Sequence, residues 1–122
     1  MESSVPQPSA DPRALLPLTP AVFYVLLALA DEDRHGYGIA KDVQSRTDGQ
    51  VRLGPGTLYG TLTRLTDAGL VVERPTRAAD ERRRYYRLTP FGRRVAQAEA
   101  ERLAHMVTIA RDKALLAGGR GR

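Results

Sequence analysis

Apolar residues fill one segment near the N-terminus without interruption, AVFYVLLALA from Ala21 to Ala30. Thr19 and Pro20 directly precede this segment. A threonine hydroxyl can accept a hydrogen bond from the free N–H groups of a first helical turn, and proline is pre-set for that turn. The pattern predicts a helix from Pro20 to about Ala30 that is apolar on every face. A small domain can hardly cover such a helix alone, so we expect a second chain to cover part of it.

A second helix is predicted in HGYGIAKDVQSRT, residues 35–47, because its apolar and polar residues separate onto two sides. Ile39, Ala40 and Val43 form the apolar side. Tyr37, Lys41 and Gln44 form the polar side. The DGQVRLGPG that follows has turn signals at Asp48-Gly49 and Gly54-Pro55, with VRL between them as a candidate short strand.

The third predicted helix, Pro55 to Gly69, carries its leucines on one side. Leu58, Leu62 and Leu65 follow at helical spacing and form the inward stripe. The opposite side and its flanks are small and rich in hydroxyl groups: Gly56, Gly60, Thr63, Arg64, Asp67, Thr57, Tyr59 and Thr61. An ordinary solvated face is the alternative, but each glycine costs roughly 1 kcal/mol relative to alanine. A face stripped of long side chains suits close approach to a DNA major groove.

After the third helix, the hydrophobic period changes from helical to alternating. LVVERP and RRRYYRLT are joined by the polar TRAADE, a pattern that predicts a two-stranded antiparallel ribbon. In its second strand we expect Tyr86 and Leu88 to face the helices, because apolar bodies pack inward. Arg83 and Arg87 should then face solvent, with Arg82 and Arg83 near the tip.

Three helices followed by a ribbon are typical of the winged helix-turn-helix, here an α+β fold that is mainly α. The stretch from Arg82 to Arg94 holds six arginines and no acidic residue, at the place where a phosphate backbone would pass the wing. A solvated charge run is the alternative for its triple arginine. We predict binding to double-stranded DNA. The predicted contact residues are Tyr37, Lys41, Thr57, Tyr59, Gly60, Thr61, Arg64, Arg82, Arg83 and Arg84.

Thr89-Pro90 repeats the helix-start signal and opens a long amphipathic helix, predicted to continue to residue 117. A monomer would leave much of its apolar stripe in water, so we expect this helix and the first one to pair with a second copy of the chain. The predicted dimerisation residues are Phe23, Leu26, Leu27, Val95, Leu103, Met106, Val107 and Ala110. A two-fold dimer presents two equivalent recognition helices, so its DNA site should be near-palindromic.

The chain has 122 residues, enough for a single domain, and 19 Lys plus Arg against 14 Asp plus Glu give a net charge of +5. This balance favours polyanionic partners. The predicted segments are a flexible proline-rich tail (1–17), the winged helix-turn-helix domain (18–89), the dimerisation helix (90–117) and a disordered end (118–122).

Several classes of function are excluded by what the sequence contains. It has no cysteine, which indicates an intracellular protein without disulfides or thiolate metal sites. Its longest apolar run, Ala21 to Ala30, is about half of what a membrane-spanning helix needs, so we expect a cytoplasmic protein with no membrane contact. His35 has no second ligand at metal-binding spacing and is expected to shape the start of the second helix. Asp31, Glu32 and Asp33 indicate a helix end rather than a general acid pair. No cofactor, metal site or enzymatic activity is predicted.

Three stretches resemble the PadR family of bacterial transcriptional regulators: HGYGIAKDV, RLGPGTLYGTLTRLTDAGLV and ERRRYYRLTPFGRR. The resemblance extends from about Leu18 to the C-terminus. It implies a homodimeric winged-helix repressor with a single C-terminal dimerisation helix, as in the shorter branch of the family. Members of that branch often have serine where this chain has Gly54, a difference that concerns only the strength of the helix cap.

Two questions stay open at the level of sequence. One is whether a small-molecule inducer binds, since some family members hold aromatic compounds between tryptophans and this chain has none. Phe23 and Tyr24 could line a small interface pocket, although packing in the core or the dimer is the favoured interpretation. The other is whether the domain binds DNA or is a winged-helix protein-interaction module with an incidental basic surface.

Overall fold

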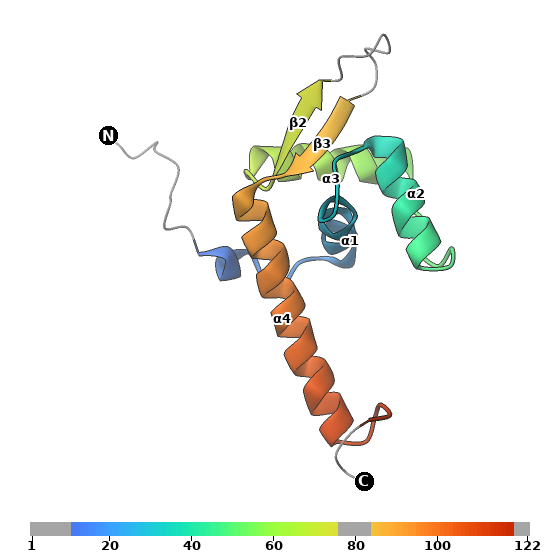
Figure 1. Ribbon diagram of the computed structural model, residues 1–122, viewed down its shortest axis with the longest axis vertical. Coiled ribbons are helices and arrows are strands. Elements are labelled where there is room, and N and C mark those ends of the chain that lie inside the picture. The colour runs from blue at the N-terminus through green and yellow to red at the C-terminus, as the bar shows by residue number, and fades with distance from the viewer. Residues whose placement is uncertain (1–10, 76–83, 119–122) are drawn as a thin grey trace.

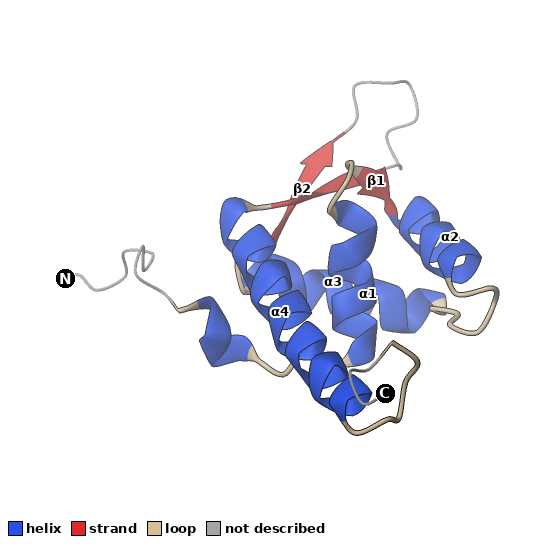
Figure 2. Cartoon of the chain, turned by 60° about the horizontal axis from the view of Figure 1, so that its bottom comes forward, coloured by secondary structure: helices blue, strands red, loops and turns tan. Residues whose placement is uncertain are grey.

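The computed structural model describes residues 11–75 and 84–118. Their elements are η1 (Pro12–Leu15, a 3-10 helix), α1 (Pro20–Leu29), β1 (Arg34–His35), α2 (Gly36–Arg46), α3 (Pro55–Asp67), β2 (Val71–Pro75), β3 (Arg84–Leu88) and α4 (Pro90–Asp112). The sheet lies at one end of the domain, and α4 runs from it past α1 and away from the other helices (Figure 1, Figure 2). This mainly helical winged arrangement confirms the predicted fold class.

Helix α1 lies at the centre of the domain and begins as the sequence predicts. The Thr19 hydroxyl accepts a hydrogen bond from the Val22 N–H at 3.2 Å, and Pro20 occupies the first turn. Contacts with α2, α3, α4 and β3 bury Val25 and Leu26 completely, while Leu27 remains 44% exposed. The domain therefore covers most of this helix by itself. The assignment of Leu26 to a dimer interface is wrong, because its side chain belongs to the core of one chain.

The antiparallel sheet has the order β1-β3-β2, with Glu73 of β2 opposite Tyr86 of β3 and Arg34 of β1 on the other side of Tyr86. The sequence did not predict β1. The predicted strand at residues 51–53 is wrong: both edges of β3 are already paired, and the Val51 N–H is taken by the Thr47 hydroxyl at 3.0 Å. Val51 and Leu53 pack against the core from a loop instead.

Residues near both termini differ from the predicted segments. Residues 1–10 and 119–122 lie outside the described part of the chain, but the predicted tail is too long, because η1 packs against α4 and Leu16 packs on the core. At the other end, α4 stops at Asp112 rather than continuing to residue 117, and a turn follows in which Ala114 has a φ of 68°.

Candidate nucleic-acid interface

The start of α2 is fixed by His35, as the sequence predicts. Its Nδ1 accepts a hydrogen bond from the Gly38 N–H at 3.0 Å and so satisfies one of the free N–H groups of the first turn. The imidazole ring also stacks on Tyr37, at 6.3 Å between ring centroids, and meets Tyr85 of β3 edge-on at 5.5 Å. His35 is hydrogen-bonded to α2 and its ring contacts Tyr85 of β3. Because Tyr37 stacks on the same ring, the exposed Tyr37 is held beside the sheet.

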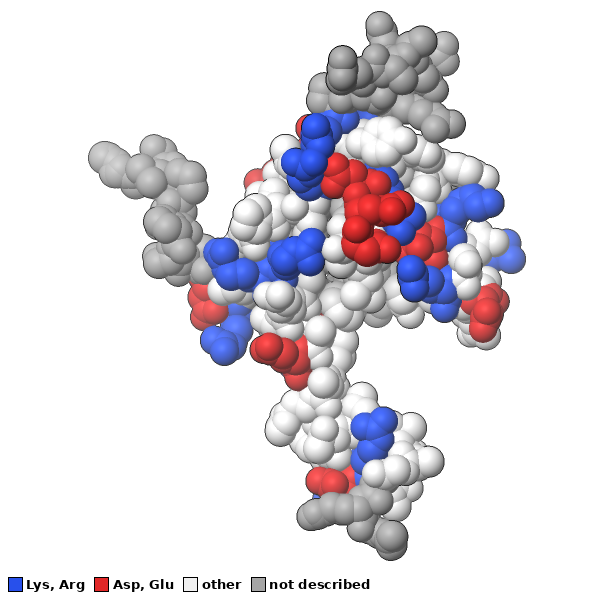
Figure 3. Space-filling model, in the orientation of Figure 1, with Lys and Arg blue, Asp and Glu red and all other residues white. Residues whose placement is uncertain are grey.

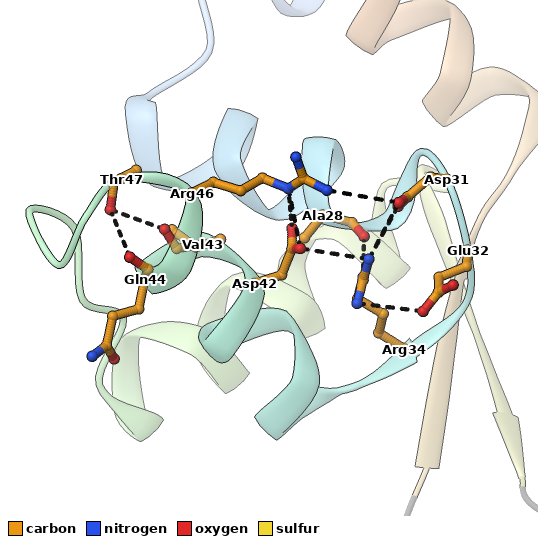
Figure 4. A network of polar contacts seen from close by, with 9 residues as sticks. All are labelled: Ala28, Asp31, Glu32, Arg34, Asp42, Val43, Gln44, Arg46 and Thr47. Carbon is orange, nitrogen blue, oxygen red and sulfur yellow. Dashed lines mark hydrogen bonds and ion pairs between the residues drawn. The ribbon is translucent and has the colours of Figure 1, made fainter.

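A network of arginines and acids connects α2, and the strand before it, to the end of α1 (Figure 4). The Nε of Arg34 donates to the Ala28 carbonyl at 2.6 Å, and its guanidinium pairs with Asp31 at 3.3 Å and Asp42 at 3.5 Å. Arg46 pairs with Asp42 at 3.1 Å. The acidic turn therefore closes the end of α1, as predicted, and it also positions α2.

Helices α2 and α3 make close contact where Gly36 meets Tyr59. A Cβ atom at position 36 would overlap the Tyr59 ring, so a larger residue there would displace this ring. Tyr59 is nevertheless 47% exposed and Tyr37 is 66% exposed, with the Lys41 ammonium 5.7 Å from the centroid of the Tyr37 ring. Two aromatic rings and a cation therefore lie together on the outer side of these helices. The sequence did not predict the contact between Gly36 and Tyr59.

Two hollows flank these tyrosines. The first is an open cleft of about 970 Å³ between α2 and α3, bordered by Lys41 and Gln44 as well as by both tyrosines. The second, of about 530 Å³, lies between α3 and the wing, where Glu73 and Arg84 complete the lining. Tyr37 and Tyr59 border both, so the two hollows adjoin each other on one side of the domain.

The outward face of α3 has the low floor that its glycines predict. A Cβ atom at Gly56 would meet nothing within 4 Å, and one at Gly60 would meet only the Nη1 of Arg64, at 3.8 Å. Neither glycine is therefore needed for packing against residues 11–75 or 84–118. Thr57 and Arg64 are exposed beside this floor. The inward stripe is also as predicted, since Leu58, Leu62 and Leu65 are buried.

The position of Thr61 differs from the predicted one. Its side chain is 1% exposed and lies among the buried leucines, so its assignment to the DNA-contacting face is wrong. The reason is visible in the helical spacing, because position 61 lies three residues after Leu58 and four before Leu65, on the same side as both.

The described part of the wing carries arginines that are paired with acids. Tyr86 and Leu88 are buried, as predicted. Arg84 bonds to Glu73 at 2.9 Å, and Arg87 pairs with Asp33 at 3.1 Å, so Arg87 is half-exposed and paired rather than simply solvated. Figure 3 shows acidic side chains lying between the basic ones on the face that it presents. Arg82 and Arg83 lie outside the described residues, and their predicted role stays a prediction.

Residues 25–98 match the family model described as the transcriptional regulator PadR-like family. The chain belongs to this family. The fold agrees: a PadR family transcription regulator from Clostridium difficile R20291 aligns with a TM-score of 0.65 and 24% sequence identity, over 76% of this chain and 96% of that structure.

Two further proteins are similar in sequence. The 37.1 kDa protein in transposon TN4556 of Streptomyces fradiae is 43% identical over 86 residues, which are 70% of this chain and 24% of that protein. Transcriptional regulator Rv3488 of Mycobacterium tuberculosis is 37% identical over 70 residues, which are 57% of this chain and 63% of the regulator. The chain thus spans less than two thirds of the length of either relative.

In this PadR-like chain, one face of α4 changes its environment along the helix. Gly92, Val95, Ala96 and Glu99 are buried against the domain and η1. The same face continues at helical spacing through Leu103, Met106, Val107 and Ala110, where Met106 is 52% and Val107 37% exposed. The assignment of Val95 to a dimer interface is therefore wrong, because it is fully buried within one chain. The C-terminal part of α4 extends past the rest of the domain (Figure 1).

Glu99 is a buried carboxylate that the sequence analysis missed. It is 2% exposed, accepts hydrogen bonds from Arg102 at 2.7 and 2.9 Å, and accepts another from the Leu18 N–H at 3.2 Å. The hydrogen bonds from Arg102 hold the pKa of Glu99 below its ordinary value. Glu99 thereby ties the segment before α1 to α4 of the PadR-like domain. Its spacing of three residues to Arg102 was the signal available in the sequence.

Replacing Glu99 with glutamine should lower the free energy of unfolding by about 2 kcal/mol at neutral pH, because charge-assisted hydrogen bonds are lost. The folded pKa of Glu99 lies below its unfolded value, near 4.5, so its ionised form stabilises the fold above that value. This stabilisation is lost as the pH falls through the folded pKa. Urea unfolding of both proteins should therefore show a difference that closes at acidic pH. Glu101→Gln, at an exposed position of the same helix, is the control and should unfold like the wild type.

Within residues 11–75 and 84–118, no group of three or more His, Asp or Glu side chains is arranged to hold a metal ion. In the same ranges, no helix combines the length and the apolar character required to cross a membrane.

Proposed function

We propose that this chain is a sequence-specific DNA-binding transcriptional regulator, a homodimeric repressor that acts in the cytoplasm on a near-palindromic operator. The outward face of α3 is the observation that carries this proposal. Gly56 and Gly60 keep its centre free of side chains, and among the described residues a Cβ atom there would meet at most the Nη1 of Arg64, at 3.8 Å. A helix with such a floor can approach base edges in a major groove closely.

The residues around this floor have separate roles in the proposal. Thr57 and Arg64 are exposed on α3 and would reach base edges or the adjacent phosphates. Tyr37 and Lys41 of α2, together with Tyr59, would contact the phosphate backbone beside the groove. Arg84 would extend the contact to the wing.

Dimerisation is supported by the apolar face of α4 beyond Glu99. Met106 and Val107 are exposed there in a single chain, and Leu27 of α1 is exposed as well. Exposed apolar side chains of this kind favour burial against a symmetry-related copy. Two copies related by a two-fold axis would place their α3 helices in successive major grooves, so half-sites should be centred about 10 base pairs apart or at a multiple of that distance.

Replacing Lys41 with alanine should weaken binding to DNA, because one phosphate contact per subunit is lost. In titrations of a duplex at several salt concentrations, the slope of log K against log salt should become shallower by about 0.9 per subunit. Lys113→Ala removes the same charge at the end of α4, away from α2 and α3, and should bind like the wild type.

The competing function, a protein-interaction module with an incidental basic surface, gives a different result. In that case the wild-type protein would not enrich any sequence from a random DNA pool. Its binding to a duplex would also be the same for Lys41→Ala and Lys113→Ala. Either observation would contradict the proposed function.

A further inference from the structure

All three arginines that β2 and β3 carry in the described residues are held by acids of the same chain. Arg74 and Arg87 both pair with Asp33, at 3.2 and 3.1 Å, and Arg84 pairs with Glu73 at 2.9 Å. We propose that Glu73 competes with DNA phosphates for Arg84 and thereby limits the affinity of the wing for DNA. The proposal rests on the proposed DNA-binding function and assigns Glu73 a role in setting its strength.

The position of Glu73 distinguishes it from Asp33. In the register of the sheet, Glu73 lies opposite Tyr86, whose ring is buried toward the helices, so Glu73 and Arg84 project on the side of the sheet that faces α3. Both line the hollow of about 530 Å³ between α3 and the wing, together with Tyr59. In this proposal, a DNA strand that passes from the outward face of α3 to the wing would cross this hollow. Asp33 borders a different hollow, which includes no residue of α3.

The pair is too weak to be needed for the stability of the fold. Glu73 is 35% and Arg84 is 59% exposed, and ion pairs of such exposure contribute little to folding because water competes for both partners. A phosphate can therefore replace Glu73 at Arg84. A carboxylate that has been displaced remains next to the incoming phosphate, however, and the two negative charges repel each other.

The charge of Glu73 also affects its neighbour in the same hollow. Burial raises the pKa of the Tyr86 hydroxyl, and the negative charge of Glu73 raises it further. The field of this carboxylate thus acts across the face of the sheet that is turned to α3. A phosphate that enters the hollow would experience the same field.

Glu73→Gln tests the proposal, since glutamine keeps the size of the side chain and removes its charge. We expect this variant to bind a random-sequence duplex about fivefold more tightly at low salt. The slope of log K against log salt should steepen by about 0.9 per subunit, because Arg84 becomes free to displace one further counterion. Glu101→Gln changes the net charge equally on the exposed side of α4 and should alter neither quantity beyond the effect of overall charge.

The double variant Glu73→Gln with Arg84→Ala separates a specific effect of Arg84 from a general effect of charge. It should lose the gain in affinity and return to the shallower slope. The proposal is overturned if Glu73→Gln binds no more tightly than Glu101→Gln, or if the double variant keeps the full gain. A wild-type protein that binds no duplex at any salt concentration would instead contradict the proposed function itself. Circular dichroism of each variant checks that the fold is retained.

Discussion

Val107→Asp should turn the protein into monomers and abolish its binding to a palindromic operator. In a single chain Val107 is 37% exposed and lies next to Met106 on the apolar face of α4 beyond Glu99. If that face is buried against a second copy, an aspartate there leaves an unpaired carboxylate in an apolar interface. This should weaken association by about 3 kcal/mol or more. Sedimentation velocity at micromolar concentration measures the loss of the dimer.

Thr108→Asp provides the matched control for this experiment. It introduces the same charge one residue further along α4, about 100° around the helix and away from Leu103, Met106 and Ala110. This variant should remain a dimer and bind DNA normally. A wild-type species of monomer mass that binds a half-site as tightly as the full palindrome would contradict the dimer, the role of α4 and the half-site spacing together.

Gly60→Leu should abolish sequence-specific binding while leaving the fold and the dimer intact. The free chain has room for the larger side chain, because a Cβ atom at position 60 meets only the end of the flexible Arg64. A leucine would instead fill the space in which we place the floor of the DNA groove. Affinity for the selected operator should then fall to the level of random DNA, a loss of about 10³-fold or more. Fluorescence anisotropy with both duplexes gives the ratio.

Gly60→Ala is the control, since it adds a single methyl group at the same position. Alanine should raise the free energy of unfolding by roughly 1 kcal/mol through its helix propensity, with a much smaller loss of specific affinity than leucine causes. Equal operator binding by the leucine variant and the wild type would show that this face of α3 does not enter the groove.

Signals confined to one or two helical turns were sufficient to predict most of the helices. Thr19 with Pro20, and Thr89 with Pro90, mark helix starts through bonds to N–H groups only three residues away, and the structure has both. The leucine spacing in α3 predicted its buried side for the same reason, because side chains three and four residues apart share a face wherever the helix packs. The capping role of His35 is equally local.

Contacts between distant parts of the chain decided what the sequence could not determine. Strand β1 exists because β3, about 50 residues later, offers it an edge, and Asp33 meets Arg87 across 54 positions. Leu26 and Val95 fill the core, whereas Leu27 and Met106 remain exposed, and apolar character alone could not predict this difference. Which side chains are buried depends on how α1 and α4 pack against the other elements. The pairing of Arg84 with Glu73 depends on strand register, so this arginine, which the sequence presents within a basic run, acquires its acidic partner only when the chain folds.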